Sequence, residues 1–240
     1  MSDELLYPLP GVSVSIGPRL VHVRSEEPLT TLSSAVVGGG ARRTRDILNV
    51  HVSDQYDGMP ADDLAAVAAD LGVQGHAVGL LTAAYTEFAR CVVETRGELT
   101  VAAVVSVGLS NTSSAGVTPP FDAGDEAADG PDGAPRPGTI NVILLVDGAL
   151  TPAAMVNAVI TVTEAKTMVL RAWEVKTPEG DDASGTSTDT VVVACSGRGD
   201  ELGYAGPATT VGWLAGRTVR AAMTRICEDK VARDGGRIGW

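Results

Sequence analysis

Residues 138–175 read GTINVILLVDGALTPAAMVNAVITVTEAKTMVLRAWEV, residues 184–195 read SGTSTDTVVVAC, and together they decide the fold. Thr139–Val146 is an almost continuous apolar run of strand length. Thr151-Pro152 can begin a helix, because the threonine hydroxyl can cap it and proline is favoured at the first helical position. Asp189–Cys195 is a second apolar, β-branched run. The stretch therefore predicts a strand–helix–strand unit that is long enough for a crossover.

The predicted helix, which ends at about Trp173, is apolar on nearly all sides and is therefore expected to be covered on more than one side. Lys166 falls among its apolar residues and needs a partner, for which Asp189 is the candidate. The alternative is that the lysine reaches water along its own stem and that Glu164 is solvated. Four polar residues share the opposite stripe of the helix: Asn157, Thr161, Glu164 and Arg171.

Composition excludes several classes of protein. The 240 residues carry 30 acidic and 18 basic side chains, a formal net charge of −12, which argues against binding to nucleic acid or to anionic membranes. We expect no membrane span and no signal peptide, because no apolar run reaches the length needed to cross a bilayer and the start MSDELLYPLPG has neither a basic nor an apolar region. The three cysteines form no CxxC pair, which is typical of a reducing compartment. We expect a soluble cytoplasmic protein.

The remaining segments predict an α+β or α/β fold: a single domain over residues 1–240 with a mixed β-sheet core and about three main helices. The acidic stretch 118–138 is expected to be a disordered loop, and 229–240 a loose tail. Besides the central unit we expect strands at Val12–Ile16, Leu20–Arg24, Leu29–Val37, Asp46–Val52, Ala77–Ala83, Cys91–Thr95 and Leu99–Leu109, and helices at Ala61–Leu71 and Thr210–Glu228.

Several motifs resemble the adenosylcobinamide amidohydrolase family of cobalamin salvage. They are, in chain order, TLSSAVVGGG, ILNVHV, VGLSN, GTINVILLVDGAL, NAVITVTEAKT, GTSTDTVVVAC and AGPATTVGWLAGRTV, and the resemblance covers roughly residues 29–225. It implies hydrolysis of the amide that joins the corrin side chain to aminopropanol, with release of adenosylcobyric acid. The partner it implies is a small corrinoid substrate, with no separate cofactor, no nucleic acid and no membrane; a homo-oligomer is possible.

Hydrolysis of an amide needs an activated water or nucleophile, and an acid for the leaving amine. No metal site is expected, because His22, His51 and His76 lie in separate segments and no HxxxH or HExxH pattern occurs. A site of His51 with carboxylates from elsewhere remains the alternative. His22 and His76 alternate with apolar residues and are expected to do no chemistry.

A serine nucleophile is a second route to amide hydrolysis, beside water activated by a metal. Ser33 and Ser34 stand before the glycine run Gly38-Gly39-Gly40, although no GxSxG elbow is present. Strand alternation places the two serines on opposite faces, so at most one of them serves a given cleft. Asn49 and His51 point the same way from their strand and are candidates to line a site.

Carboxylate base catalysis by Glu164 or Asp189 is the third route, and these routes stay open. The catalytic candidates are Glu164, His51, Asp189, Ser34 and Lys166. The candidates for substrate binding are Ser33, Gly38, Gly39, Asn49, Asn141, Asn157, Thr161, Thr186 and Thr188. Two other functions stay open as well: a corrinoid-binding protein without activity, and an amidohydrolase for another amide.

Overall fold

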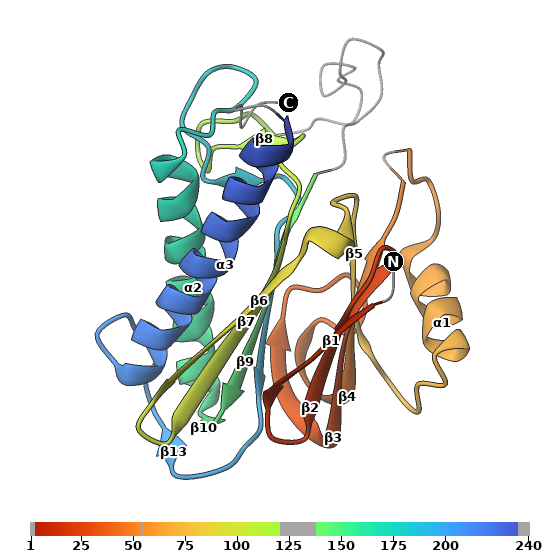
Figure 1. The fold of residues 1–240 in the computed structure, drawn as a ribbon, viewed down its shortest axis with the longest axis vertical. Helices are drawn as coiled ribbons and strands as arrows, with labels where there is room; N and C mark the ends of the chain where they lie inside the picture. The colour runs from red at the N-terminus through yellow and green to blue at the C-terminus, as the bar shows by residue number, and fades with distance from the viewer. Residues whose placement is uncertain (1–2, 54, 121–137, 235–240) are drawn as a thin grey trace.

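A computed structural model describes residues 3–53, 55–120 and 138–234, and arranges them in three layers (Figure 1). Two long helices cover one face of the C-terminal part of a mixed sheet, and the N-terminal strands of the same sheet fold back over the other face. The predicted fold class is confirmed, with three α-helices and a sheet of nine strands in the described part of the chain. The expected acidic loop falls mostly on residues 121–137, which lie outside the described residues.

The helices are α1 (Pro60–Asp70), α2 (Pro152–Ala172) and α3 (Thr210–Asp234), and a short 3₁₀ turn, η1, spans Thr86–Phe88. The strands of the large sheet are β1 (Glu4–Leu9), β2 (Val12–Ile16), β3 (Leu20–Ser33), β4 (Gly40–His51), β5 (Val78–Thr82), β6 (Arg90–Arg96), β7 (Leu99–Val107), β9 (Ile140–Asp147) and β12 (Thr190–Cys195). Four shorter strands form two small ladders: β8 (Thr112–Ser113), β10 (Ala149–Leu150), β11 (Gly185–Thr186) and β13 (Glu201–Leu202).

The central unit is β9–α2–β12, as the sequence predicts. Thr151 caps α2, since its hydroxyl oxygen accepts a hydrogen bond from the Ala154 N–H at 3.1 Å. The crossover makes β9 and β12 parallel neighbours, with Asn141 opposite Thr190 and Val146 opposite Cys195. β7 runs antiparallel on the other side of β9, so the sheet is mixed.

Alternation along β9 divides its side chains between two hydrophobic cores. Val142 and Leu144 pack in the core beneath α2 and α3. Ile143 and Leu145 pack in the second core, which β1 to β5 cover. Asn141 has the same parity as Ile143, so its side chain points into the layer between the strands and away from α2.

Several expected boundaries are wrong: β4 begins at Gly40 instead of Asp46, and β3 ends at Ser33 instead of Val37. β3 is one strand where the sequence predicted two, because a register shift between Arg24 and Leu29 bends it without ending it. Its first half pairs with β2, and its second half pairs with β12. α3 continues through the start of the expected loose tail, as far as Asp234.

α2 also corrects the expectation about membrane spans, because its length and mean hydropathy of 1.3 are those of a helix that could cross a bilayer. Half of that window is buried inside the protein, where α2 packs against β12 and α3. A buried core helix can have the same length and composition, so these two properties do not distinguish a core helix from a membrane-spanning helix.

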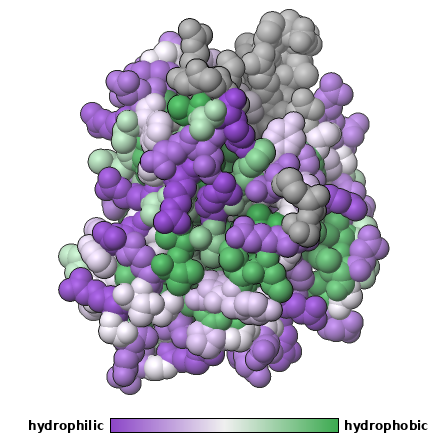
Figure 2. All heavy atoms as spheres, viewed as in Figure 1, coloured by the Kyte–Doolittle hydropathy of each residue, from purple (hydrophilic) through white to green (hydrophobic). Residues whose placement is uncertain are grey.

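Figure 2 shows a mostly hydrophilic face, with apolar residues gathered at mid-height over β1 and β6. These two strands end the strand order of the sheet and contact each other. The exposed large hydrophobic residues of these two strands are Leu5, Tyr7 and Val93.

Candidate functional site

Polar side chains from distant segments meet at one end of the sheet, where β4, β5 and β7 end and β9 and β12 begin. Asn49, Ser106 and Asn141 form an amide cluster in the second core, and each is no more than 2% exposed. The Asn141 Nδ2 donates to Asn49 Oδ1 at 2.8 Å and to the Leu81 carbonyl at 2.9 Å. Asn49 Nδ2 donates to Ser106 Oγ at 2.9 Å. Because buried polar groups are costly unless paired, this cluster fixes how the two strand layers meet.

A second cluster surrounds the carboxylate of Asp189, just before β12. Lys166 forms an ion pair with Asp189 Oδ2, which confirms the predicted partner, and both side chains are largely buried. The Thr186 N–H donates to Oδ2 at 3.2 Å, and the Ile140 N–H donates to Oδ1 at 3.0 Å. The Thr186 hydroxyl donates to Oδ1 at 2.5 Å. With both oxygens occupied, Asp189 holds α2 and the start of β9 in place and is poorly placed to take a proton from water.

Gly185 makes room for this carboxylate cluster. A Cβ at this position would overlap Asp189 Oδ2 and lie 2.5 Å from Lys166 Nζ. We expect Gly185→Ala to lower the free energy of unfolding by about 1–3 kcal/mol, as overpacking does. Gly203→Ala is the matched control, because no atom lies within 4 Å of its Cβ position. Equal urea midpoints for the two variants would contradict the tight packing.

Threonine hydroxyls connect the two clusters. Thr139 Oγ1 lies 2.8 Å from the Thr188 carbonyl, to which it donates, and 3.5 Å from Asn141 Oδ1. Thr188 donates its own hydroxyl to the Gly138 carbonyl at 2.8 Å. Sequence reasoning missed Ser106 and Thr139, which lie inside apolar strand runs and give no signal of their own.

Asn111 was also missed, although it ends the VGLSN motif. Its Nδ2 donates to Ser187 Oγ at 2.8 Å, which joins the end of the β7 segment to the loop before β12. Its Oδ1 is buried and has no hydrogen-bond partner among the described residues. Its place in the VGLSN motif is the signal in the sequence that could have identified it.

His51 ends β4 at the rim of the amide cluster and is half-buried. Its Nδ1 lies 3.1 Å from the Ala84 carbonyl, and its ring stacks on Tyr85 with the centroids 5.4 Å apart. A carbonyl can only accept, so we assign the proton of the neutral ring to Nδ1. Nε2 then carries the lone pair of a base.

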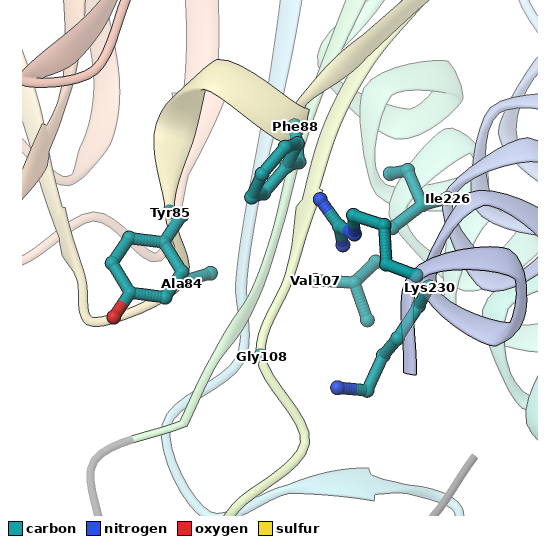
Figure 3. Close-up of a pocket in the computed structure, with 8 residues that line it drawn as sticks. Ala84, Tyr85, Phe88, Val107, Gly108, Ile226 and Lys230 are labelled. Atoms are coloured by element: carbon teal, nitrogen blue, oxygen red, sulfur yellow. The ribbon is translucent and has the colours of Figure 1, made fainter. Parts of the chain in front are cut away.

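A pocket of about 100 Å³ opens at Ala84 and Tyr85, the two residues that His51 contacts, although His51 itself is not part of its lining (Figure 3). Tyr85 and Phe88 come from the segment after β5, and Lys230 and Ile226 face them from α3. Arg233 stacks on Phe88, with its guanidinium carbon 3.4 Å from the ring centroid. Two cations and two aromatic rings thus border the pocket, and none of the described residues that line it is acidic.

The serine and glycine candidates make structural contacts. Ser33 Oγ accepts from the Ala35 N–H at 2.9 Å, and Ser34 Oγ accepts from the Val191 N–H at 3.2 Å. Ser33 is buried and Ser34 is exposed, in keeping with opposite faces. Gly38 has φ +68°, and its Cβ would lie 2.6 Å from the Ala77 carbonyl. Gly39 is similarly crowded, by the Ala35 carbonyl, so Gly38 allows close packing at the start of β5 and Gly39 allows a tight connection after β3.

Glu164, Asn157 and Thr161 do not join the other candidates. They lie on α2, on the opposite face of the sheet from Asn49 and Asn141. Thr161 is buried and donates to the Ala205 carbonyl at 3.0 Å, Asn157 is half-buried, and Glu164 is exposed. The stripe that the sequence placed in a cleft therefore belongs to the helix layer and its surface.

Neither thiols nor metal ligands gather at this end of the sheet. Burial raises the pKa of Cys195 to about 12 and the pKa values of Cys91 and Cys227 to about 11, which disfavours a thiolate nucleophile. No group of three or more His, Cys, Asp or Glu residues that could hold a metal occurs within the described ranges. His22 Nε2 lies 2.8 Å from Asp46 Oδ1, a pairing of neighbouring strands.

Known proteins and a family model match most of the chain. A family model described as adenosylcobinamide amidohydrolase matches residues 11–234. A protein of Methanosarcina mazei named adenosylcobinamide amidohydrolase is 30% identical over 189 residues, which are 75% of this chain and 80% of that protein. A Halobacterium salinarum protein with the same name is 34% identical over 165 residues, 69% of this chain.

A further relative, from Methanocaldococcus jannaschii and described as uncharacterized, is 35% identical over 98 residues, which are 39% of this chain. The chain covers 38% of the length of that protein and 64% of the length of the Halobacterium protein.

Proposed function

The chain belongs to the adenosylcobinamide amidohydrolase family, and we propose that it hydrolyses the amide of adenosylcobinamide that joins the corrin side chain to aminopropanol. The products are adenosylcobyric acid and aminopropanol, and the first of them would return to cobalamin synthesis. The reaction adds the oxygen of one water to the amide carbon and breaks the C–N bond, and the leaving nitrogen takes up a proton. The three free cysteines support a reducing, cytoplasmic setting for it.

His51 is the general base of this proposal, and its hydrogen bond to the Ala84 carbonyl is the observation that carries it. With Nδ1 as the donor, Nε2 can take a proton from water as the oxygen attacks, and can return it to the leaving amine. The charges of Asp189 and Lys166 are paired with each other, so in this proposal the two residues position the strands around the site. Asn49 and Asn141 hold the end of β4, and therefore His51, against β9.

The pocket beside His51 suggests how the substrate lies. Its volume of about 100 Å³ suits a group as small as aminopropanol. It is well below the roughly 300–1,000 Å³ of pockets that enclose whole ligands. In this proposal the aminopropanol arm enters between Phe88 and Lys230, and the corrin ring lies over the rim near Tyr85.

The direct test is to mix the purified protein with adenosylcobinamide and to quantify free aminopropanol. Release in proportion to enzyme and time is the expected result. A shift of the corrinoid spectrum without release of aminopropanol would support a binding protein instead. Hydrolysis of other amides, with adenosylcobinamide left intact, would support an amidohydrolase for a different substrate.

Activity is expected to survive prolonged dialysis against a strong chelator. The reason is the spacing of the histidines, together with the satisfied environment of Asp189. The measurement is the rate of aminopropanol release before and after dialysis. A loss that is reversed only by added zinc would contradict this expectation and would make His51 a candidate ligand.

A further inference from the structure

α2 presents an apolar surface to solvent along its whole length. Val156, Ile160 and Met168 are each about half exposed, at 51%, 50% and 50%. At about 100° per residue, the exposed positions of α2 from Ala153 to Arg171, together with the half-buried Thr167, fall within one arc of roughly 140°, and only the exposed end residues Pro152 and Ala172 lie outside it. We call this the α2 outer face; its members are Ala153, Val156, Ile160, Thr163, Glu164, Thr167, Met168 and Arg171.

The two threonines make this face more apolar than its sequence indicates. Thr163 donates its hydroxyl to the Val159 carbonyl at 2.8 Å. Thr167 donates to the carbonyls of Thr163 and Ser184, both at 3.0 Å. Both hydroxyls are thus satisfied within the protein, and their methyl groups remain to meet a partner.

The charges of the α2 outer face balance, in a chain whose formal net charge is −12. Its charged members are Glu164 and Arg171, and neither belongs to an ion pair within the part of the chain that the structure describes. A charge-poor apolar patch on a strongly charged protein is typical of the core of an interface.

We propose that the α2 outer face joins two copies of this chain in a two-fold dimer. Glu164 and Arg171 are seven residues apart, so they lie two turns apart on nearly the same side of the helix. If two α2 helices cross antiparallel about a point between Thr167 and Met168, each Glu164 meets Arg171 of the partner subunit. Such an isologous contact forms the Glu164–Arg171 pair twice and covers Met168, whereas Val156 and Ile160 lie beyond the end of the partner's α2.

The test is the oligomeric state of the wild-type chain and of charge-reversed variants, measured by analytical ultracentrifugation over a range of concentrations. The wild-type chain is expected to be a dimer. Glu164→Arg or Arg171→Glu alone turns two attractive pairs into two repulsive pairs and should raise the dissociation constant by roughly 10- to 100-fold. The double variant Glu164→Arg/Arg171→Glu restores opposite charges and should return the constant close to that of the wild type.

The matched control is Val93→Glu, at an exposed apolar position on β6, which should leave the dimer unchanged. A monomeric wild-type chain would overturn the proposal, as would a dissociation constant that neither single reversal changes. A double variant that stays dissociated would also overturn it. So would a monomer that floats with phosphatidylcholine vesicles, because α2 would then face lipid. None of these outcomes depends on amidohydrolase activity.

Discussion

Replacing His51 with glutamine is expected to lower the single-turnover rate of amide hydrolysis by about 10²–10⁴-fold, the usual contribution of a general base. Glutamine can still donate to the Ala84 carbonyl, so the end of β4 should keep its position. It has no nitrogen lone pair with which to take a proton from water. The measurement is aminopropanol release with enzyme in excess, beside the affinity for adenosylcobinamide, which should change little.

His76→Gln is the matched control, because His76 is an exposed histidine outside the amide cluster, and its rate should equal that of the wild type. Full activity of His51→Gln would contradict the proposed base. If Glu164→Gln then lost activity at unchanged affinity, the base would be the glutamate that the sequence first suggested.

Replacing Lys166 with methionine is expected to lower the free energy of unfolding by about 3 kcal/mol, because it leaves the carboxylate of Asp189 buried without its cation. For a chain of this size that is a fall in melting temperature of roughly 6–12 °C. The measurement is a urea titration and a melting curve, with turnover measured well below the transition.

Lys176→Met is its matched control. Lys176 also pairs with a carboxylate, that of Asp182, but both side chains are more than half exposed, so the melting temperature should change little. A Lys166→Met variant that melts like the wild type but has lost turnover would show that the lysine takes part in chemistry.

The hydrophobic pattern of the sequence predicts the central unit of the fold. The capped helix start at Thr151 and the flanking apolar runs lead directly to β9, α2 and β12. The place of Lys166 among apolar residues also predicts its pair with Asp189, because a buried charge needs a partner. These features depend on local periodicity and on the cost of burial, which a single sequence expresses.

The candidate site was predicted only in part, because it depends on how distant strands pair. Asn49 and Asn141 were chosen for their strand positions, but nothing local shows that they touch, or that Ser106 lies between the layers with them. The helical stripe that carries Glu164 was predicted to line a cleft, although the same stripe can face solvent or a partner. Periodicity gives the face of a helix, and only tertiary packing decides what that face meets.

Water is expected to cleave the amide of adenosylcobinamide, and an incubation in ¹⁸O-labelled water tests this most directly. Mass spectrometry of the products should find one ¹⁸O atom in the new carboxylate of adenosylcobyric acid and none in aminopropanol. The His51→Gln variant should form the same labelled product far more slowly. Unchanged adenosylcobinamide, bound to the protein and recovered without label, would contradict the account.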